Sequence, residues 1–541
     1  MSARSASRRP SFLSGVSLLA LSTVLVKIIG LFYRIPLLHH LGTEGMGYFN
    51  TAYELYALFC VMATAGIPVA MSVLISRFEA GGERENAGRV YRISLLLLLG
   101  LGVGGAVLLW GLSHPLAALL GNPLAAAGMR AISPTLLFIC LSSAFRGYFQ
   151  GRRNMLPTAL SQVIEAGGKL FMGLAFAAWA KGKGMSLPTV AAYAILGLTL
   201  GTAVSLLYLA IHKRIWDAHE AKAVSSTSGN PSAPVLRPLL ATAIPVTFSA
   251  AVMSLTKCVD LALILHRLQE TGYSVTAANE LYGCYSTLAV PVFNMIPSLT
   301  TSVALSAAPA LSAALQKGKE GERELRRTAT SALGLTLLVA IPGGMGLSVF
   351  AEDILSLLFG GQPEAVALAS PWLSCLGLSI PAACLVSVTG AMLQAAGKAN
   401  RPIISMLAGV GCKTVLAYAL LGNPQWGMLG APVSSLLCDT VIVALNLGFV
   451  ARHAPAMLPT RSEAFFLPAI PILWGSVAVG VVLRMRRSLG WQTVTPLHTL
   501  GTIACVACLY GAGMLLCLLL RTMYKKKDIS HEQADQRTTR P

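Results

Sequence analysis

The chain has 541 residues, of which 55% are hydrophobic and only 12% are charged, whereas about a quarter of an ordinary soluble domain is charged. With a mean hydropathy of +0.67, this composition excludes a soluble enzyme, because one buried core stops growing near about 250 to 300 residues and needs a charged surface. The net charge of +19 would suggest nucleic acid in a soluble protein, so the positions of the basic residues decide what it means.

Apolar segments follow one another along almost the whole chain. A segment of about 20 apolar residues crosses about 30 Å of hydrocarbon, so cuts at charge clusters and at breaks rich in Gly, Pro and Asn predict about fourteen transmembrane helices. The first segment is too long for a signal peptide and contains Lys27, so we interpret it as an uncleaved span. The predicted helices cover residues 12–38, 47–76, 93–112, 130–150, 156–180, 188–211, 239–266, 281–312, 331–352, 370–396, 403–421, 428–451, 466–483 and 497–520.

Basic residues are concentrated in alternate loops. About 29 Lys and Arg fall on the side of the N-terminus, about 7 on the opposite side and about 5 within spans, so the positive-inside rule predicts that both termini are cytoplasmic. The positive charge therefore requires no nucleic acid. Arg484, Arg486 and Arg487 fall on the predicted outer side, and the orientation of the loop between the last two helices stays open.

The longest inner loop, His212 to Pro238, divides the chain into two halves that carry matching marks. Gly82-Glu83-Arg84-Glu85 follows helix two, and the same four letters recur at residues 321–324 after helix eight. Ile-Pro pairs in these two helices and Gln-Gly-Asn-Pro patterns after helices four and ten share the offset of six helices. An even offset predicts parallel repeats about an axis along the membrane normal, with a cavity between them.

These marks predict an all-α polytopic membrane protein with two six-helix lobes related by a pseudo-two-fold axis and two additional C-terminal helices. The spacings Gly100-xxx-Gly104 and Gly197-xxx-Gly201 are expected to allow close helix packing. The predicted parts are a cytoplasmic N-terminal tail (1–11), an N-lobe (12–211), a cytoplasmic linker (212–238), a C-lobe (239–451), two further helices (466–520) and a cytoplasmic basic tail (521–541).

Motifs for enzymatic chemistry are missing from the sequence. No Gly-Lys pair is followed by Ser or Thr, so the phosphate-binding loop of an ATPase is absent. His219-Glu220 lacks the second histidine of a zinc-binding helix, and Cys505 and Cys508 lie in an apolar span without a companion pair. The sequence therefore predicts a non-enzyme with no metal site and no cofactor, in which cysteines serve as small apolar residues.

Ionisable residues inside the predicted spans are the candidates for a functional site. A charge at mid-membrane costs about 2.5 to 3.5 kcal/mol and usually faces a cavity or a partner. Glu165 and Lys169 are four residues apart, and Lys257 and Asp260 are three apart, so each pair could meet on one helical face. Local neutralisation and a cavity role are equally favoured for both pairs. Lys413 and Asp439, on predicted helices eleven and twelve, could pair with each other. The predicted substrate-binding residues of the central cavity are Lys27, Arg34, Glu54, Lys257, Asp260, Lys413 and Asp439.

Several stretches resemble, in order and spacing, the polysaccharide-flippase family of the multidrug/oligosaccharidyl-lipid/polysaccharide exporter superfamily, with its sporulation proteins and the related lipid II flippases. The resemblance implies two lobes around a central cavity and alternating access, and by position Lys27 and Arg34 match cavity-facing basic residues on the first helix of the lipid II flippases. On helix two those relatives carry a further arginine, where this chain has Glu54. The stretches are LGTEGMGYFNTAYELY (41–56), GIPVAMS (66–72), RGYFQGRRNMLPTALSQVIE (146–165), LYGCYSTLAVPVFNMIPSLTTSVA (281–304) and GMLGAPVSS (427–435).

The resemblance implies a flippase in the cytoplasmic membrane that moves an undecaprenyl-diphosphate-linked saccharide, a peptidoglycan precursor or a surface polysaccharide unit, with a role in sporulation left open. Its partners would be the lipid-linked saccharide and membrane lipids, with coupling to a monovalent cation or to the membrane potential left open. The alternative is a cation-coupled multidrug exporter of the same superfamily, which would need carboxylates in the cavity. Lys27, Arg34 and Lys413 against Glu54 and Asp439 favour an anionic substrate. A scaffold for an envelope complex would leave the buried charges unexplained.

Overall fold

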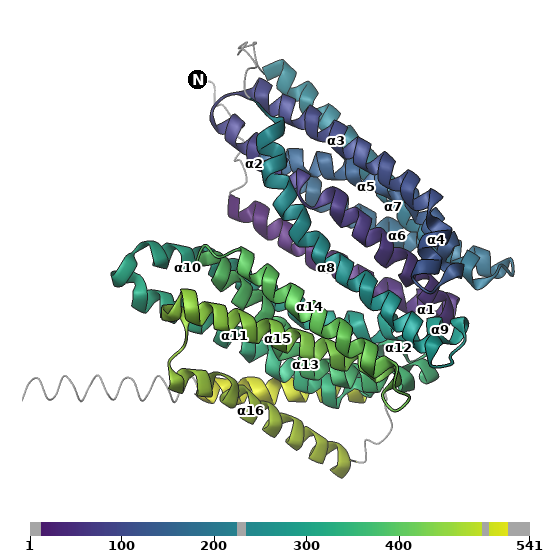
Figure 1. The fold of residues 1–541 in the computed structure, drawn as a ribbon, viewed down its shortest axis with the longest axis vertical. Helices are drawn as coiled ribbons and strands as arrows, with labels where there is room; N and C mark the ends of the chain where they lie inside the picture. The colour runs from purple at the N-terminus through teal and green to yellow at the C-terminus, as the bar shows by residue number, and fades with distance from the viewer. Residues whose placement is uncertain (1–11, 224–233, 490–496, 518–541) are drawn as a thin grey trace, which may run out of the picture. The chain divides into compact units, whose positions relative to one another are not determined.

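The computed structural model describes residues 12–223, 234–489 and 497–517. The predicted N-terminal tail, residues 224–233 of the 212–238 linker and the basic tail 521–541 lie outside the described residues. Within the described ranges the structure consists of helices joined by short turns, without a strand (Figure 1). Thirteen helical segments of these ranges are long and apolar enough to cross a membrane. The predicted all-α polytopic membrane fold is confirmed.

The first helical segment, α1 (Phe12–Thr64), contains two predicted spans rather than one. Its residues from Leu21 onward form, with α2 (Ile67–Ala80), an apolar stretch of 60 residues, about three times what one crossing needs. Gly42 interrupts the helix with φ 64° and ψ −178°, a conformation open to glycine. The ring centroids of Tyr33 and Phe49 are only 6.2 Å apart, whereas a straight helix would separate them by about 24 Å. The chain therefore folds back at Gly42, and the predicted count of about fourteen spans agrees with the structure.

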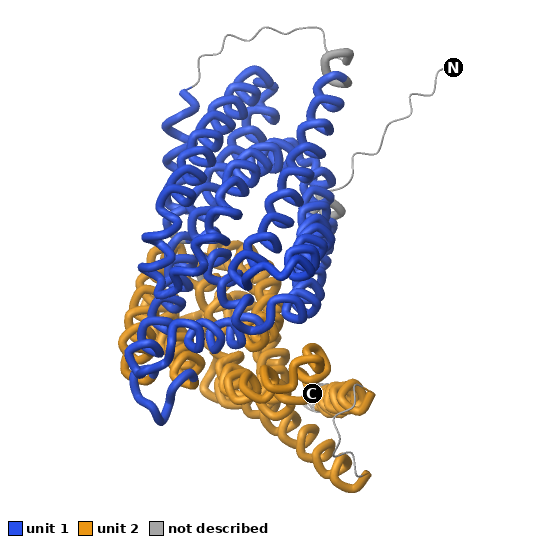
Figure 2. Tube along the Cα trace, turned by 90° about the vertical axis from the view of Figure 1, so that its right-hand side faces the viewer, with its two compact units in different colours: residues 1–287, 421–428 blue, residues 288–420, 429–541 orange. Residues whose placement is uncertain are grey.

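The chain forms two compact units, shown in blue and orange in Figure 2. Unit 1 comprises residues 1–287 and 421–428, and unit 2 comprises residues 288–420 and 429–541. The packing boundary therefore falls after Thr287 and not in the 212–238 linker, so α8 and α9 pack with the first half of the chain. The predicted lobes concern a sequence repeat and not packing, and they stay a prediction.

Unit 1 is a bundle in which α1 packs against α6, α8 and α9, and α5 against α3 and α7. Glycines bring α6 and α7 into backbone contact: a Cβ on Gly197 would lie 2.1 Å from the amide nitrogen of Gly173, and one on Gly201 within 3.0 Å of the α6 backbone. The close packing predicted for Gly197 and Gly201 is confirmed, whereas nothing lies within 4 Å of a Cβ on Gly100 or Gly104, so that expectation was wrong. The helices are α1, α2, α3 (Arg84–Gly111), α4 (Ser113–Leu119), α5 (Ala126–Gly151), α6 (Leu156–Gly182), α7 (Leu187–Ala223), α8 (Leu236–Glu270) and α9 (Val275–Cys284).

Unit 2 is a second bundle, in which α13 lies against α10, α11 and α15. Arg486 is one of the three basic residues that fall on the predicted outer side, against the positive-inside rule. It forms an ion pair with the buried Asp353. The pair places the start of α12 and the end of α16 at the same end of unit 2, as the predicted topology requires. The helices are α10 (Val290–Gln316), α11 (Glu322–Val349), α12 (Ala351–Phe359), α13 (Pro363–Ala395), α14 (Asn400–Leu421), α15 (Gly430–His453), α16 (Arg461–Ser488) and Leu497–Cys517.

Candidate functional site

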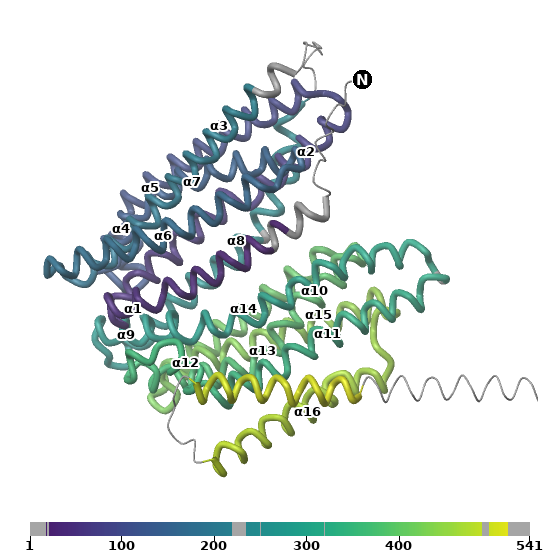
Figure 3. Tube along the Cα trace, turned by 180° about the vertical axis from the view of Figure 1, so that it is seen from behind, coloured from purple at the N-terminus to yellow at the C-terminus, as the bar shows by residue number. Residues whose placement is uncertain are grey.

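Charged and aromatic side chains converge inside unit 1, on both arms of α1 and on α6. Figure 3 shows α1, in purple, beside α6 and close to α9, and these helices are in contact. The residues involved lie within the candidate membrane spans of these helices. We call the side chains of Arg34, Glu54, Arg146, Glu165 and Lys169, with the rings around them, the basic cluster.

Lys169 occupies an aromatic environment built by the fold-back of α1. Its Nζ atom lies 5.1 Å from the ring centroid of Tyr33, on the first arm, and 4.6 Å from that of Tyr53, on the second arm. Phe49 contributes a third ring at 5.8 Å. An ammonium within about 6 Å of a ring face is attracted by the ring quadrupole. The rings therefore stabilise the positive charge of Lys169, which forms no ion pair with a carboxylate in the described part of the chain.

Arg34 is held by an irregular stretch of backbone. Its guanidinium donates a hydrogen bond of 2.9 Å to the carbonyl oxygen of Ser286, which lies in a π-helical segment, Tyr285–Ala289, after α9. Such segments disturb the regular i to i+4 ladder and occur often at functional sites. The Asn50 amide donates to the hydroxyl oxygens of Ser286 and Thr287, both at 2.8 Å, which fixes this segment beside α1.

The carboxylates of the cluster have other partners than sequence spacing suggested. Glu165 forms an ion pair of 2.7 Å with Arg146 of α5, whose side chain is 13% exposed. Arg146 also donates to the hydroxyls of Ser161 and Ser205. The ion pair of Glu165 is therefore made with Arg146 and not with Lys169, four residues along α6, because α5 places a guanidinium between neighbouring helices. Glu54 is half-buried and acts electrostatically on Arg34.

The basic cluster carries a positive net charge. It holds three basic side chains and two carboxylates, so its formal charge is +1. Within the described ranges no carboxylate forms an ion pair with Lys169 or Arg34. The buried hydroxyl of Tyr33 likewise has no hydrogen-bond partner there. Guanidinium, ammonium and phenol donors in an apolar surrounding suit an anion with several acceptor oxygens, such as a phosphate.

The structure brings together only part of the predicted cavity set. Arg34 and Glu54 belong to the basic cluster, while Lys27 is exposed on the first arm of α1. Lys257 is exposed on α8. It borders the cluster, because the thiol of its neighbour Cys258 donates to the backbone carbonyl of Glu54 at 3.5 Å.

Of the remaining three residues, one lies on α8 and two lie in unit 2. Asp260 is half-buried on α8. Lys413 and Asp439 belong to unit 2, where both are half-buried and interact electrostatically, as expected from their possible pairing. A cavity role for the seven residues stays a prediction.

Sequence reasoning missed the most distinctive residues of the cluster. Spacing along the helix relates Lys169 only to Glu165 and does not indicate Arg146, which belongs to another helix. One signal was available, because Phe49, Tyr53 and Tyr56 recur at helical spacing on one face of the second span. Tyr33 joins them only through the fold-back at Gly42, and no sequence pattern marked the π-helical segment that binds Arg34.

Comparison with known proteins places this geometry in context. The sequence profile described as polysaccharide biosynthesis protein matches residues 12–315, more than half of the chain, and a second profile, MatE, matches residues 278–419. Stage V sporulation protein B of Bacillus subtilis (strain 168) is 24% identical over 524 residues, covering 96% of this chain and 97% of that protein. Lipid II flippase MurJ of the same strain is 26% identical over 460 residues, covering 81% of this chain and 80% of that protein.

A solved structure has the same fold. The structure of lipid II flippase MurJ in an inward closed conformation aligns with a TM-score of 0.67 at 14% sequence identity, covering 94% of this chain and all of that chain. At this identity the likeness concerns the fold. It agrees with the multi-pass helical architecture described above.

Proposed function

We propose that this chain, which belongs to the polysaccharide biosynthesis protein family, is a flippase that moves an undecaprenyl-diphosphate-linked saccharide across the cytoplasmic membrane. The relatives of similar length include a lipid II flippase and a sporulation protein, which supports a peptidoglycan precursor or a surface polysaccharide unit as the cargo. The observation that carries the proposal is the basic cluster: Lys169 and Arg34 lie inside apolar spans, and no carboxylate of the described residues forms an ion pair with either.

The chemistry of the cargo matches this charge. A diphosphate in transit loses the water that solvates its charges, so cations must replace that water. The Arg34 guanidinium offers several N–H donors in a planar fork, and the Lys169 ammonium offers a compact charge that can leave the rings for a stronger partner. Cation–π attraction is about 0.5 to 2 kcal/mol, less than a charge-assisted contact with phosphate in an apolar site. The polyprenyl chain stays in lipid.

The energy source and the orientation belong to the proposal as well. The chain has no ATPase motif, so alternating access is driven by the membrane potential or by a monovalent cation. Both termini are cytoplasmic in the proposed orientation, because the loops on that side carry most of the Lys and Arg.

The second candidate is a cation-coupled multidrug exporter. The MatE profile over residues 278–419 and the half-buried Asp439 of unit 2 favour it. An exporter of cations depends on carboxylates, whereas a diphosphate flippase depends on basic residues. The two functions therefore predict opposite sensitivities for Arg34 and Glu54.

Transport in proteoliposomes tests the proposal. The full-length chain is reconstituted with a fluorescent undecaprenyl-diphosphate disaccharide, and the fraction reaching the other leaflet is followed with a membrane-impermeant quencher. Arg34→Gln should abolish transport while the protein still inserts, since a neutral side chain is easier to bury. Glu54→Gln should keep transport within about threefold unless Glu54 orients Arg34.

The matched control is Arg130→Gln, which removes an exposed guanidinium that lies over Trp110 in the same unit but outside the basic cluster. It should transport like the parent protein. Full transport by Arg34→Gln together with an inactive Glu54→Gln protein would reverse the ranking in favour of the exporter.

A further inference from the structure

The same backbone turn follows α5 in unit 1 and α13 in unit 2. After α5, the amide of Arg153 donates to the carbonyl of Gln150 and the amide of Asn154 to that of Phe149, both at 2.9 Å. After α13, the amide of Gly397 donates to Gln394 at 3.0 Å and that of Lys398 to Leu393 at 2.9 Å. The two turns are therefore equivalent, and Arg153 stands where unit 2 has Gly397.

Arg153 adopts a conformation that favours glycine. Its φ angle is 58°, close to the 72° of Gly397, and it is the one non-glycine residue with positive φ in the described ranges. A Cβ makes this left-handed region unfavourable, and such outliers concentrate at functional sites. Unit 2 reaches the same turn without strain, so turn geometry alone does not require an arginine. We infer a role for its side chain.

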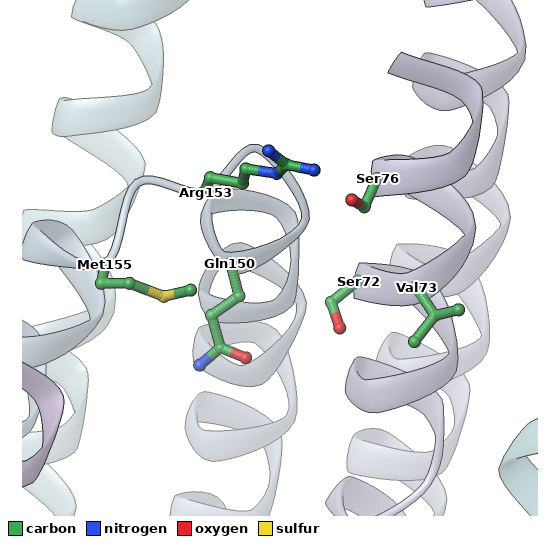
Figure 4. Close-up of a pocket in the computed structure, with 6 residues that line it drawn as sticks. All are labelled: Ser72, Val73, Ser76, Gln150, Arg153 and Met155. Carbon is green, nitrogen blue, oxygen red and sulfur yellow. The ribbon is translucent and has the colours of Figure 1, made fainter. Parts of the chain in front are cut away.

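The Arg153 side chain lines a hollow between α2 and the turn after α5. The hollow has a volume of about 520 Å³ and is also lined by Ser72, Ser76 and Gln150, with Val73 and Met155 as its apolar lining. Figure 4 shows the guanidinium extending above the hollow toward Ser76, with Gln150 and Ser72 below. This volume lies within the range of about 300 to 1,000 Å³ of small-molecule sites.

The polar groups of the hollow are available to a ligand. Among the described residues none is hydrogen-bonded or ion-paired to the side chains of Arg153, Gln150 or Ser76, and the Ser72 hydroxyl donates to the carbonyl of Val69. None of the described residues that line the hollow is a carboxylate. Glu79, at the nearby end of α2, is paired with Arg152 at 2.9 Å. The hollow therefore presents donors without a competing negative charge.

We propose that Ser76, Gln150 and Arg153, with Ser72 beside them, bind the phosphate group of a lipid. Guanidinium, amide and hydroxyl donors are the groups that hold phosphate oxygens. Val73 and Met155 provide apolar contact for the substituent, and the hollow lies at the ends of two apolar spans, where basic side chains meet headgroups. The phosphate belongs either to a diphosphate-linked lipid or to an anionic phospholipid. The site is separate from the basic cluster and does not depend on the proposed transport function.

Binding to the full-length chain in detergent tests the site, with three probes measured by thermophoresis: farnesyl diphosphate, dioctanoyl phosphatidylglycerol and inorganic phosphate. Arg153→Gly should weaken binding of a lipid probe by about tenfold. Its melting temperature should not fall, because glycine relieves the strained φ. Lys398→Gln is the control, since it removes one exposed positive charge at the equivalent turn of unit 2, and it should bind like the parent.

The pattern of losses identifies the lipid. A loss confined to farnesyl diphosphate assigns the site to a diphosphate-linked lipid, and one confined to phosphatidylglycerol assigns it to a phospholipid headgroup. Ser76→Ala leaves the backbone unchanged and should weaken binding of the same probe by about threefold. This second variant tests the site even if Arg153→Gly lowers the stability of the protein. Lipid binding unchanged in both variants, or binding of inorganic phosphate alone, would overturn the proposal.

Discussion

The two units treat intramembrane charge in different ways. In unit 1, Lys169 lies over three rings of α1 while the nearby carboxylate of Glu165 is paired with Arg146. In unit 2, the ammonium of Lys413 interacts electrostatically with the carboxylate of Asp439. Stabilising a cation with π-faces leaves its charge available to an incoming anion, whereas a nearby carboxylate offsets part of that charge. The difference predicts that anion recognition resides in unit 1.

The largest expected effect comes from the lysines of the two units. Lys169→Gln should lower the rate of lipid-linked saccharide transport by roughly a hundredfold or more, because the diphosphate loses a cation in an apolar site. Lys413→Gln should lower it by less than about threefold, since that ammonium already interacts with Asp439. Lys169→Arg should retain more transport than Lys169→Gln because it keeps the charge. Equal losses in the two units would break the comparison.

A smaller effect is expected from the ion pair that joins α12 to α16 in unit 2. Asp353→Asn leaves the partly buried Arg486 without its carboxylate, which should lower the free energy of unfolding by about 2 kcal/mol. The melting temperature of the purified protein should fall by several degrees. Glu352→Gln, at the exposed neighbouring position, should leave it unchanged. An unaltered melting temperature in Asp353→Asn would show that the pair is not structural.

The sequence predicted more of the fold than of the candidate site. Hydrocarbon requires about 20 apolar residues per crossing, so the spans could be delimited from hydropathy alone. The ion-pair partner of Glu165 could not be predicted in this way. Its position on α6 suggests Lys169, four residues on, whereas the partner in the structure is Arg146 of α5. Contacts between residues on one helix follow from spacing. Contacts between helices depend on rotations and kinks, such as the one at Gly42, that spacing does not encode.

The aromatic environment of Lys169 gives a finer test of how unit 1 keeps its charge available. Tyr53→Leu removes the ring nearest to the ammonium, at 4.6 Å, and so loses about 1 kcal/mol of cation–π attraction that a bound anion must overcome. The concentration of lipid-linked saccharide at half-maximal transport should therefore fall by about threefold to fivefold. Phe49→Leu, whose ring centroid lies at 5.8 Å, should have a weaker effect. A raised half-maximal concentration in Tyr53→Leu would mean that the ring contacts the cargo.

The smallest effect is expected at Lys27, which sequence reasoning ranked beside Arg34. The two residues are seven apart on the first arm of α1, so they share a helical face. Arg34 is fixed by the carbonyl of Ser286, whereas Lys27 is exposed and has no ion-pair partner among the described residues. An exposed ammonium is screened by water or headgroups and contributes less to holding a diphosphate. Lys27→Gln should therefore reduce the initial transport rate by about twofold to threefold, with the loss growing at low ionic strength if the residue attracts the cargo at long range. A loss as large as that of Arg34→Gln would extend the anion site along α1 from Arg34 to Lys27.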